Sequence, residues 1–133
     1  QRGQVRFSNR LLVCRVEPMI DVSIKMSVPA DKRLEVLQTI KTLLGPIRSE
    51  PGCISCCCCV DAEAEQILIF KEEWNTNEDL ATHLRSEHFS VLLGAMKLLS
   101  IEPEIRFNTI ASATGMEAVN AAREGGKQAR LKR

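Results

Sequence analysis

The sequence predicts an α+β domain in which helices cover one face of a four-stranded antiparallel sheet. Three observations lead to this class: stretches that alternate apolar and polar residues, stretches whose apolar residues recur at helical spacing, and turn residues between them. The 133 residues suffice for one domain with a real core, and 44% hydrophobic and 26% charged residues are ordinary globular values. Uninterrupted apolar runs stay far below the roughly 18 residues of a membrane span, so a soluble protein with no membrane partner is expected.

The first half of the domain is predicted to contain a strand, a helix and the start of a hairpin. "IDVSIKMSV" alternates strictly between apolar and polar residues, which predicts a half-buried strand. The helix that follows has Asp31 as its predicted N-cap and is expected to end or kink at Gly45 and Pro46. "EPG" then makes a turn into "CISCCCCV", and we expect this strand to form a hairpin with "ILIFKEEW" across the polar connection "DAEAEQ".

The second half of the domain is predicted to contain two helical segments and a last strand. Thr76 and Asp79 form a weak capping box for a helix that runs to about Ser86, and a second segment places Phe89 and Leu99 on one apolar side. "EIRFNTI" alternates again and predicts the fourth strand. The resulting order, βαββαβ, is the ferredoxin-like split βαβ arrangement.

The second face of this sheet needs a cover that the chain does not provide. The cysteine strand and "ILIF" are apolar on both faces, whereas helices can cover only one face of such a sheet. A partner subunit is the simplest cover, so we expect a homodimer whose sheets pack face to face. That packing would leave a cavity between sheet and helices for a small molecule.

Charge divides the chain into three parts. Residues 19–110 contain nine Lys/Arg against fourteen Asp/Glu, a net charge of −5, whereas residues 1–18 and 111–133 each carry +3. We interpret the first part as a basic N-terminal extension, either added to the natural chain or left by processing. The last part is interpreted as a basic C-terminal tail with at most a short helix before Gly125 and Gly126. Because these charges are spread out, solvated ends are expected and no nucleic-acid partner is predicted.

Five of the six cysteines lie in the run from Cys53 to Cys59. In a strand, Cys53, Cys57 and Cys59 face one way, and Cys56 and Cys58 face the other. Cys53 and Cys56 have the C-x2-C spacing of zinc ligands, but no second half of such a site follows, so no metal is expected and small buried apolar residues are the prediction. A catalytic thiol stays as an alternative, although no activating base lies nearby. Six cysteines and the lack of a secretory signal pattern predict a reducing, cytoplasmic location.

The polar residues with the strongest indication of chemistry lie in "EEWNTNEDLATHLRSEHF", which contains the only Trp and both His residues of the chain. A strand that ends at Trp74 provides a flat apolar wall, and the helix after it can bring His83 back towards that wall. Histidine transfers protons near neutral pH. In the alternative interpretation, Trp74, His83 and His88 only pack or cap. Two histidines five residues apart do not share a helix face, so they are not expected to bind a metal together.

The run "EPGC" before a strand, then "EEW", then the pattern W-x8-H-x4-H in "WNTNEDLATHLRSEHF" resemble the antibiotic biosynthesis monooxygenase superfamily, especially its small quinol monooxygenase-like members. The resemblance covers about residues 19–110. It implies homodimers of ferredoxin-like subunits that pack sheet to sheet into a dimeric α/β barrel. It also implies oxidation of a small hydroxylated aromatic, such as a quinol, by molecular oxygen without flavin, haem or metal.

The resemblance further implies roles for individual residues. His83 would transfer a proton, His88 would be a secondary polar contact, and Trp74 would form the wall of the ring or oxygen pocket. Four further positions are expected to contact or orient the substrate: Ser23, Lys25, Glu72 and Cys56. Glu72 would orient a histidine or serve as a structural carboxylate, and Lys25 would meet the anionic substrate or be solvated.

The chain also departs from these relatives. It has no Tyr, whereas relatives often have one near the position of Cys56. A pocket wall of sulfur implies a different substrate, thiol-based redox reactivity or lost activity. An isomerase or other small-molecule enzyme, a noncatalytic ligand-binding dimer and a haem-degrading relative therefore stay as alternatives.

Overall fold

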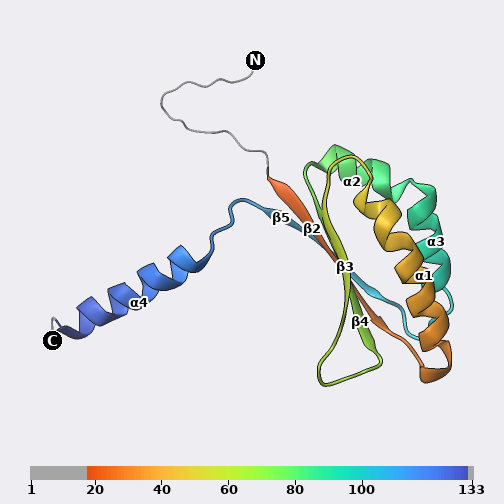
Figure 1. The fold of residues 1–133 in the computed structure, drawn as a ribbon, viewed down its shortest axis with the longest axis horizontal. Coiled ribbons are helices and arrows are strands. Elements are labelled where there is room, and N and C mark those ends of the chain that lie inside the picture. Colours follow the sequence, from red (N-terminus) through yellow and green to blue (C-terminus); the bar gives the residue numbers. More distant parts are fainter. Residues whose placement is uncertain (1–17, 132–133) are drawn as a thin grey trace, which may run out of the picture.

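A computed structural model describes residues 18–131 (Figure 1). Residues 1–17 of the predicted N-terminal extension, with Cys14, lie outside the described residues. The elements follow one another in the order β2 (Met19–Ser27), α1 (Ala30–Arg48), β3 (Cys53–Val60), β4 (Ile67–Trp74), α2 (Asn77–Leu84), α3 (Glu87–Met96), β5 (Glu104–Ile110) and α4 (Met116–Leu131).

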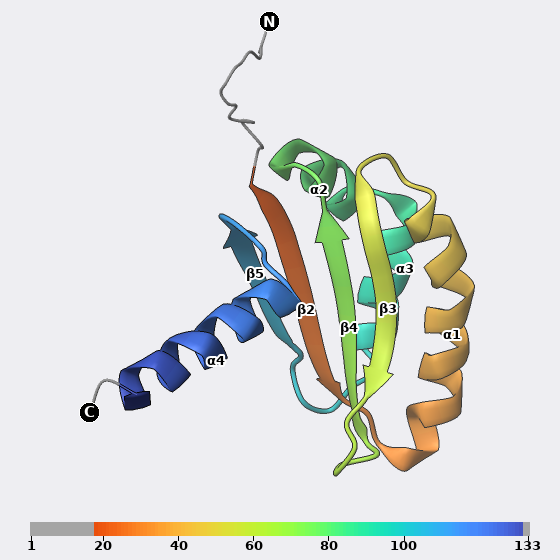
Figure 2. The same ribbon diagram turned by 60° about the vertical axis from the view of Figure 1, so that its left-hand side comes forward.

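The four strands form one sheet in the order β3-β4-β2-β5, and every neighbouring pair is antiparallel. β3 and β4 are adjacent, so the predicted hairpin is present, and the cysteine strand lies at an edge of the sheet (Figure 2). The central strand β2 pairs Ile24 with Phe70 on one side and with Ile105 on the other. This topology confirms the predicted α+β, ferredoxin-like βαββαβ fold.

The core lies between the sheet and helices α1, α2 and α3, which cover the same face (Figures 1 and 2). Strict alternation in β2 and β4 turns every second side chain towards these helices, as the sequence predicts. The buried apolar side chains with the largest volumes are Trp74, Phe70, Ile20, Ile24, Met26, Ile40, Ile47, Leu68 and Leu92. We call the other side of the sheet the open face, because no described helix covers it.

Helix α1 differs from its prediction at both ends. Its N-cap is Pro29, whose extended backbone (φ −60°, ψ 152°) leads into the helix, so the prediction of Asp31 as N-cap is wrong. Asp31 lies in the first turn, where a carboxylate favours the positive end of the helix dipole. The helix also does not end at Gly45 or Pro46. Proline removes one N–H donor only, and the backbone continues to Arg48.

The helices after the hairpin begin with hydroxyl caps, and the cap at Thr76 is the predicted one. The Thr76 hydroxyl accepts a hydrogen bond from the Asp79 backbone N–H at 3.0 Å, and the Ser86 hydroxyl accepts one from the Phe89 N–H at 3.2 Å. Ser86 therefore separates α2 from α3 and breaks the helical path between the two histidines.

The cysteine strand contains a bulge that alternation alone did not predict. The register shifts between Cys53 and Ser55, so that Cys53 lies opposite Trp74 and packs against the core. The prediction that Cys53 shares a face with Cys57 and Cys59 is therefore wrong, because Ile54 is the extra residue of the bulge.

The C-terminal helix α4 extends away from the sheet (Figures 1 and 2). It runs through Gly125 and Gly126 to Leu131, so the prediction of a short helix before the glycines is wrong. Glycine lowers helix propensity without preventing the helical conformation, and the flanking Ala, Gln, Lys and Arg residues favour it. Every side chain from Ala111 to Lys127 is exposed. Within residues 18–131, no helix is long and apolar enough to cross a membrane.

Candidate active site

Two fully buried polar side chains meet beneath helix α2. Glu72 and His83 are 0% and 1% exposed, and they are the polar or charged residues that the described core buries. Alternation in β4 places Glu72 on the helix-facing side, and His83 lies in the last turn of α2. Their contact is a 2.9 Å pair between Glu72 Oε2 and His83 Nε2. The buried carboxylate of Glu72 is therefore paired with the imidazole of His83, which can carry the opposite charge.

A second carboxylate, Glu50, joins both histidines. Its Oε1 atom lies 2.8 Å from His83 Nδ1, and its Oε2 atom lies 2.6 Å from His88 Nδ1. The loop after α1 holds Glu50 in place through Gly52, which has φ 84° and whose backbone oxygen accepts a hydrogen bond from the Asn75 N–H at 2.8 Å. A Cβ atom at Gly52 would clash with the Asp79 carboxylate, so this turn requires glycine.

Aromatic rings enclose His83 on two sides. The Trp74 ring stacks on it with centroids 4.5 Å apart and an interplanar angle of 27°, while Phe89 approaches edge-on at 5.3 Å. Trp74 Nε1 also donates a hydrogen bond to Glu72 Oε1 at 2.9 Å. Both oxygens of Glu72 are thereby occupied, and the imidazole is held in one orientation.

The electrostatics favour the protonated form of His83. Burial by itself lowers the pKa of His83, but the hydrogen bonds and negative charges of Glu72 and Glu50 act in the opposite direction and raise the pKa above its ordinary value. An imidazolium has N–H donors on both nitrogens and can donate to both carboxylates at once. In its protonated form, His83 therefore holds the two glutamates together.

Exposure increases along this cluster from the core to the surface. The side chains of Glu72 and His83 are 0% exposed, that of Glu50 is 15% exposed and that of His88 is 41% exposed. Within residues 18–131, no hydrogen bond engages His88 Nε2, whereas Nδ1 is held by Glu50. The arrangement can therefore pass a proton between solvent and a buried histidine through one carboxylate.

The structure brings together four of the seven predicted site residues directly: Trp74, Glu72, His83 and His88. Glu72 contacts a histidine, as one of its two predicted roles requires. Glu50 was missed, although it is the first letter of the quoted "EPGC" run. An acidic residue immediately before a Pro-Gly turn was the available signal.

The other three predicted residues lie apart from this cluster or only border it. Cys56 is opposite Glu72 in the β3–β4 ladder and is 3% exposed. Burial, followed by the charge of Glu72, raises the pKa of Cys56 to about 12, so its thiol stays protonated. Ser23 and Lys25 lie on the open face, and the sheet separates them from His83. Their role as substrate contacts stays a prediction.

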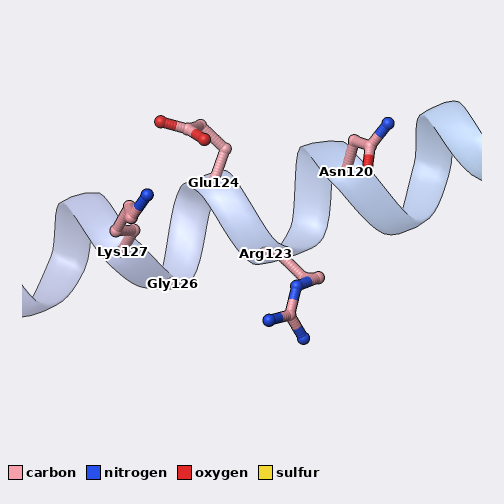
Figure 3. Close-up of a pocket in the computed structure, with 5 residues that line it drawn as sticks. All are labelled: Asn120, Arg123, Glu124, Gly126 and Lys127. Carbon is pink, nitrogen blue, oxygen red and sulfur yellow. The ribbon is translucent and has the colours of Figure 1, made fainter.

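Two further places in the described structure were candidates for a binding site, and neither forms one. A pocket on α4 is lined by Asn120, Arg123, Glu124, Gly126 and Lys127 (Figure 3). All five come from one exposed helix, and Figure 3 shows Arg123 and Glu124 pointing to opposite sides of it, so their polar groups do not converge. Among residues 18–131, no three His, Cys, Asp or Glu side chains are arranged to hold a metal ion.

The fold and these contacts define a small α+β domain with a buried Glu–His–Glu cluster beneath its helices. The family model for antibiotic biosynthesis monooxygenase matches residues 19–92, and the chain belongs to this family. The uncharacterised protein sll1783 of Synechocystis sp. (strain ATCC 27184 / PCC 6803 / Kazusa) is 30% identical over 96 residues, which are 71% of this chain and 65% of that protein. The chain thus spans less than two thirds of the length of that relative.

Solved structures agree with the fold. A conserved protein from Methanosarcina mazei Go1 has a TM-score of 0.66 at 30% identity, covering 69% of this chain and 92% of its own. A protein from Deinococcus radiodurans, named as a candidate antibiotic biosynthesis monooxygenase, has a TM-score of 0.68 at 18% identity, covering 72% of this chain and 96% of its own.

Proposed function

We propose that the protein is a cofactor-independent monooxygenase that oxidises a small hydroxylated aromatic or quinol with molecular oxygen. The observation that carries the proposal is the continuous contact chain Glu72–His83–Glu50–His88 beside Trp74. Membership of the antibiotic biosynthesis monooxygenase family supports the reaction class. In this reaction a phenol becomes a quinone: one oxygen atom of O₂ enters the ring, the other leaves as water, and the substrate supplies the electrons.

The protein's part in this reaction would be to remove the phenolic proton and hold the anion in place. Glu50 fixes Nδ1 of His88, which leaves Nε2 free at the exposed end of the cluster. His83 is buried, so a substrate would contact His88 first and His83 would exchange the proton through Glu50. Trp74 would close the inner wall. The resulting anion is the species that reduces oxygen, and positioning is the remaining task of the protein.

The assembly would be a homodimer packed across the open face. Ile67 and Ile69 of β4 are only partly buried there, as expected of a face that another sheet completes. Five free cysteines among the described residues support a reducing, cytoplasmic location.

The test is oxygen consumption by metal-depleted protein on a panel of hydroquinones and dihydroxynaphthalenes. We expect uptake above the spontaneous rate, reduced by about 10²- to 10⁴-fold in His88→Gln and in His83→Gln, because each removes a proton-transfer group. The matched control is Glu87→Gln, which changes an exposed neighbour of His88 outside the cluster. No uptake with any substrate would rule out the quinol assignment.

Proton transfer along this cluster also fits an isomerase. The same contacts among Glu72, His83 and Glu50 can move a proton between two positions of one substrate without oxygen. Turnover that persists under nitrogen and still depends on His88 would favour this alternative. Binding of an aromatic compound without turnover in either atmosphere would favour a ligand-binding protein.

A further inference from the structure

Trp74 makes two separate contacts with the buried cluster. Its ring stacks on His83 with centroids 4.5 Å apart, and its Nε1 donates a hydrogen bond to Glu72 Oε1 at 2.9 Å. A wall for the substrate requires only the ring, which a phenylalanine would also supply. The proposed oxidation therefore leaves the indole N–H of the only Trp in the chain without a role.

One oxygen of the Glu72 carboxylate depends on this N–H. Glu72 and Trp74 are two residues apart in β4, so their side chains lie on the same face of the sheet. On that face the neighbouring strand β2 places Val22 opposite Glu72 and Ile20 opposite Trp74, and neither side chain can donate a hydrogen bond. Among the described residues, the carboxylate is bonded to Trp74 Nε1 through Oε1 and to His83 Nε2 through Oε2. Without the N–H, Oε1 would be a buried acceptor that lacks a partner.

Glu72 and His83 share one proton between two buried atoms. The proton lies either on His83 Nε2, which makes an ion pair, or on Glu72 Oε2, which makes a neutral pair joined by the same 2.9 Å contact. Both residues are almost fully buried, and burial favours the neutral pair because it removes water from the charges. A hydrogen bond donated to Oε1 stabilises the carboxylate and therefore favours the ion pair. The indole N–H thus acts against the effect of burial.

Other titratable or charged groups surround this pair from the elements packed against it. They are Glu50 in the loop after α1, Arg48 at the end of α1, Cys53 and Cys56 in β3, and His88 in α3. Burial is the main cause that raises the pKa of both thiols, that of Cys56 to about 12, so the thiols stay protonated. Arg48 donates to the Cys56 backbone oxygen, and His88 is bonded to Glu50. Glu50 contacts the pair at His83 Nδ1, where its negative charge also favours the imidazolium.

We propose that Trp74 is a positioning residue that acts through Glu72: its indole N–H holds the carboxylate towards His83 and keeps the shared proton on the imidazole. The proton moves only between Glu72 Oε2 and His83 Nε2, and no other bond forms or breaks. This role differs from that of a wall beside the substrate. The charge of His83 does not depend on the proposed oxidation, whereas any effect of the N–H on turnover rests on that proposed function.

The experiment records the ¹⁵N resonances of the imidazole nitrogens in the full chain, and His88→Gln identifies the signals of His83. At about pH 6 we expect both nitrogens of His83 to be protonated in the parent protein. In Trp74→Phe, which keeps an aromatic ring but has no N–H donor, the Nε2 resonance should move towards the position of an unprotonated nitrogen, while Nδ1 keeps its proton towards Glu50. The matched control is Phe89→Leu, which changes the other ring beside His83 and leaves the N–H in place.

A second replacement keeps the test decisive if Trp74→Phe does not fold. Because Trp74 is the only Trp of the chain, growth on 3-benzothienylalanine replaces this residue alone. The analogue keeps the two fused rings and has sulfur in place of the N–H. Thermal unfolding checks that the protein with the analogue is folded, and its His83 Nε2 resonance should move as in Trp74→Phe.

Two results would overturn the proposal. Nε2 of His83 could stay protonated in both proteins that lack the N–H, or it could move as far in Phe89→Leu, which would assign the change to packing. Oxygen uptake separates this proposal from the proposed function. If the parent oxidises a quinol, the protein with the analogue should lose about 10-fold in kcat with KM within about twofold, because the N–H does not touch the substrate. If the parent takes up no oxygen, the proposed function fails, and the ¹⁵N resonances still decide the role of Trp74.

Discussion

The two faces of the sheet place neighbouring residues of one type in opposite environments. Glu72 and Glu73 are adjacent in β4, yet Glu72 is fully buried against His83 and Trp74, whereas Glu73 lies on the open face and accepts a hydrogen bond from Ser55 Oγ at 2.9 Å. Their intrinsic chemistry is identical. The comparison teaches that in this domain the face of a strand, and not the residue type, decides whether a side chain belongs to the buried Glu–His–Glu cluster or to the surface.

The largest difference between the faces should appear when each glutamate is changed to alanine. Glu72→Ala leaves the buried His83 with one carboxylate fewer and the Trp74 N–H without its acceptor, so we expect a loss of about 3–5 kcal/mol in the free energy of unfolding. Glu73→Ala should change it by no more than about 0.5 kcal/mol. Urea unfolding measures both, and equal losses would contradict the comparison.

The cysteines of β3 offer a smaller version of the same test. Cys56→Ser places a hydroxyl in the core and is expected to cost about 1–3 kcal/mol if the hydroxyl finds no partner. Cys57→Ser replaces an exposed thiol, so its unfolding free energy should stay within about 0.5 kcal/mol of that of the parent protein. Chemical denaturation of the two single variants measures both changes in unfolding free energy. A greater loss of unfolding free energy in Cys57→Ser would mean that another surface buries the open face.

The pH dependence of stability should reveal the buried imidazolium. The pKa of His83 in the folded protein is raised, so its contribution is fully present below the unfolded value, about 6.5, and is lost as pH rises through the folded value. The difference in unfolding free energy between the parent and His83→Gln should therefore shrink as the pH rises above neutral. Unfolding measured at a series of pH values tests this, with Glu87→Gln as control. A difference that grows with pH would show that His83 is buried neutral.

The smallest effect is expected from the helix that belongs to neither face. Side chains of α4 are exposed as far as Lys127, so ending the chain at Thr114 should change the unfolding free energy of the domain by less than about 0.5 kcal/mol. Calorimetry at several protein concentrations is the measurement. A larger loss that depends on concentration would indicate that α4 binds a second copy.

Much of the fold could be predicted from local patterns. Alternation in "IDVSIKMSV", the capping hydroxyl of Thr76 and the turn residues of "EPG" act over a few residues, so their outcome is readable along the chain. The contact between Trp74 and His83 was also predictable from the sequence, because the end of a strand and the helix that follows it lie close together in the chain. The errors at Asp31 and Gly125 arose because several residues in a row could serve as a boundary, and small energies choose among them.

Contacts between residues far apart in the chain were harder to predict from the sequence. Glu50 is 33 residues from His83 and 38 from His88, and only the docking of the loop at Gly52 against α2 brings them together. The bulge at Ile54, which turns Cys53 inward, depends on pairing with β4 and not on β3 itself.

The amino-acid sequence by itself determined the elements, their order and the residue types available for chemistry, because periodicity and turn chemistry are local properties. Tertiary structure alone decided which carboxylates meet His83, which end of the cluster reaches solvent and which cysteines are buried. Those outcomes depend on distances between residues far apart in the chain, and on desolvation that exists only after the sheet and helices have packed.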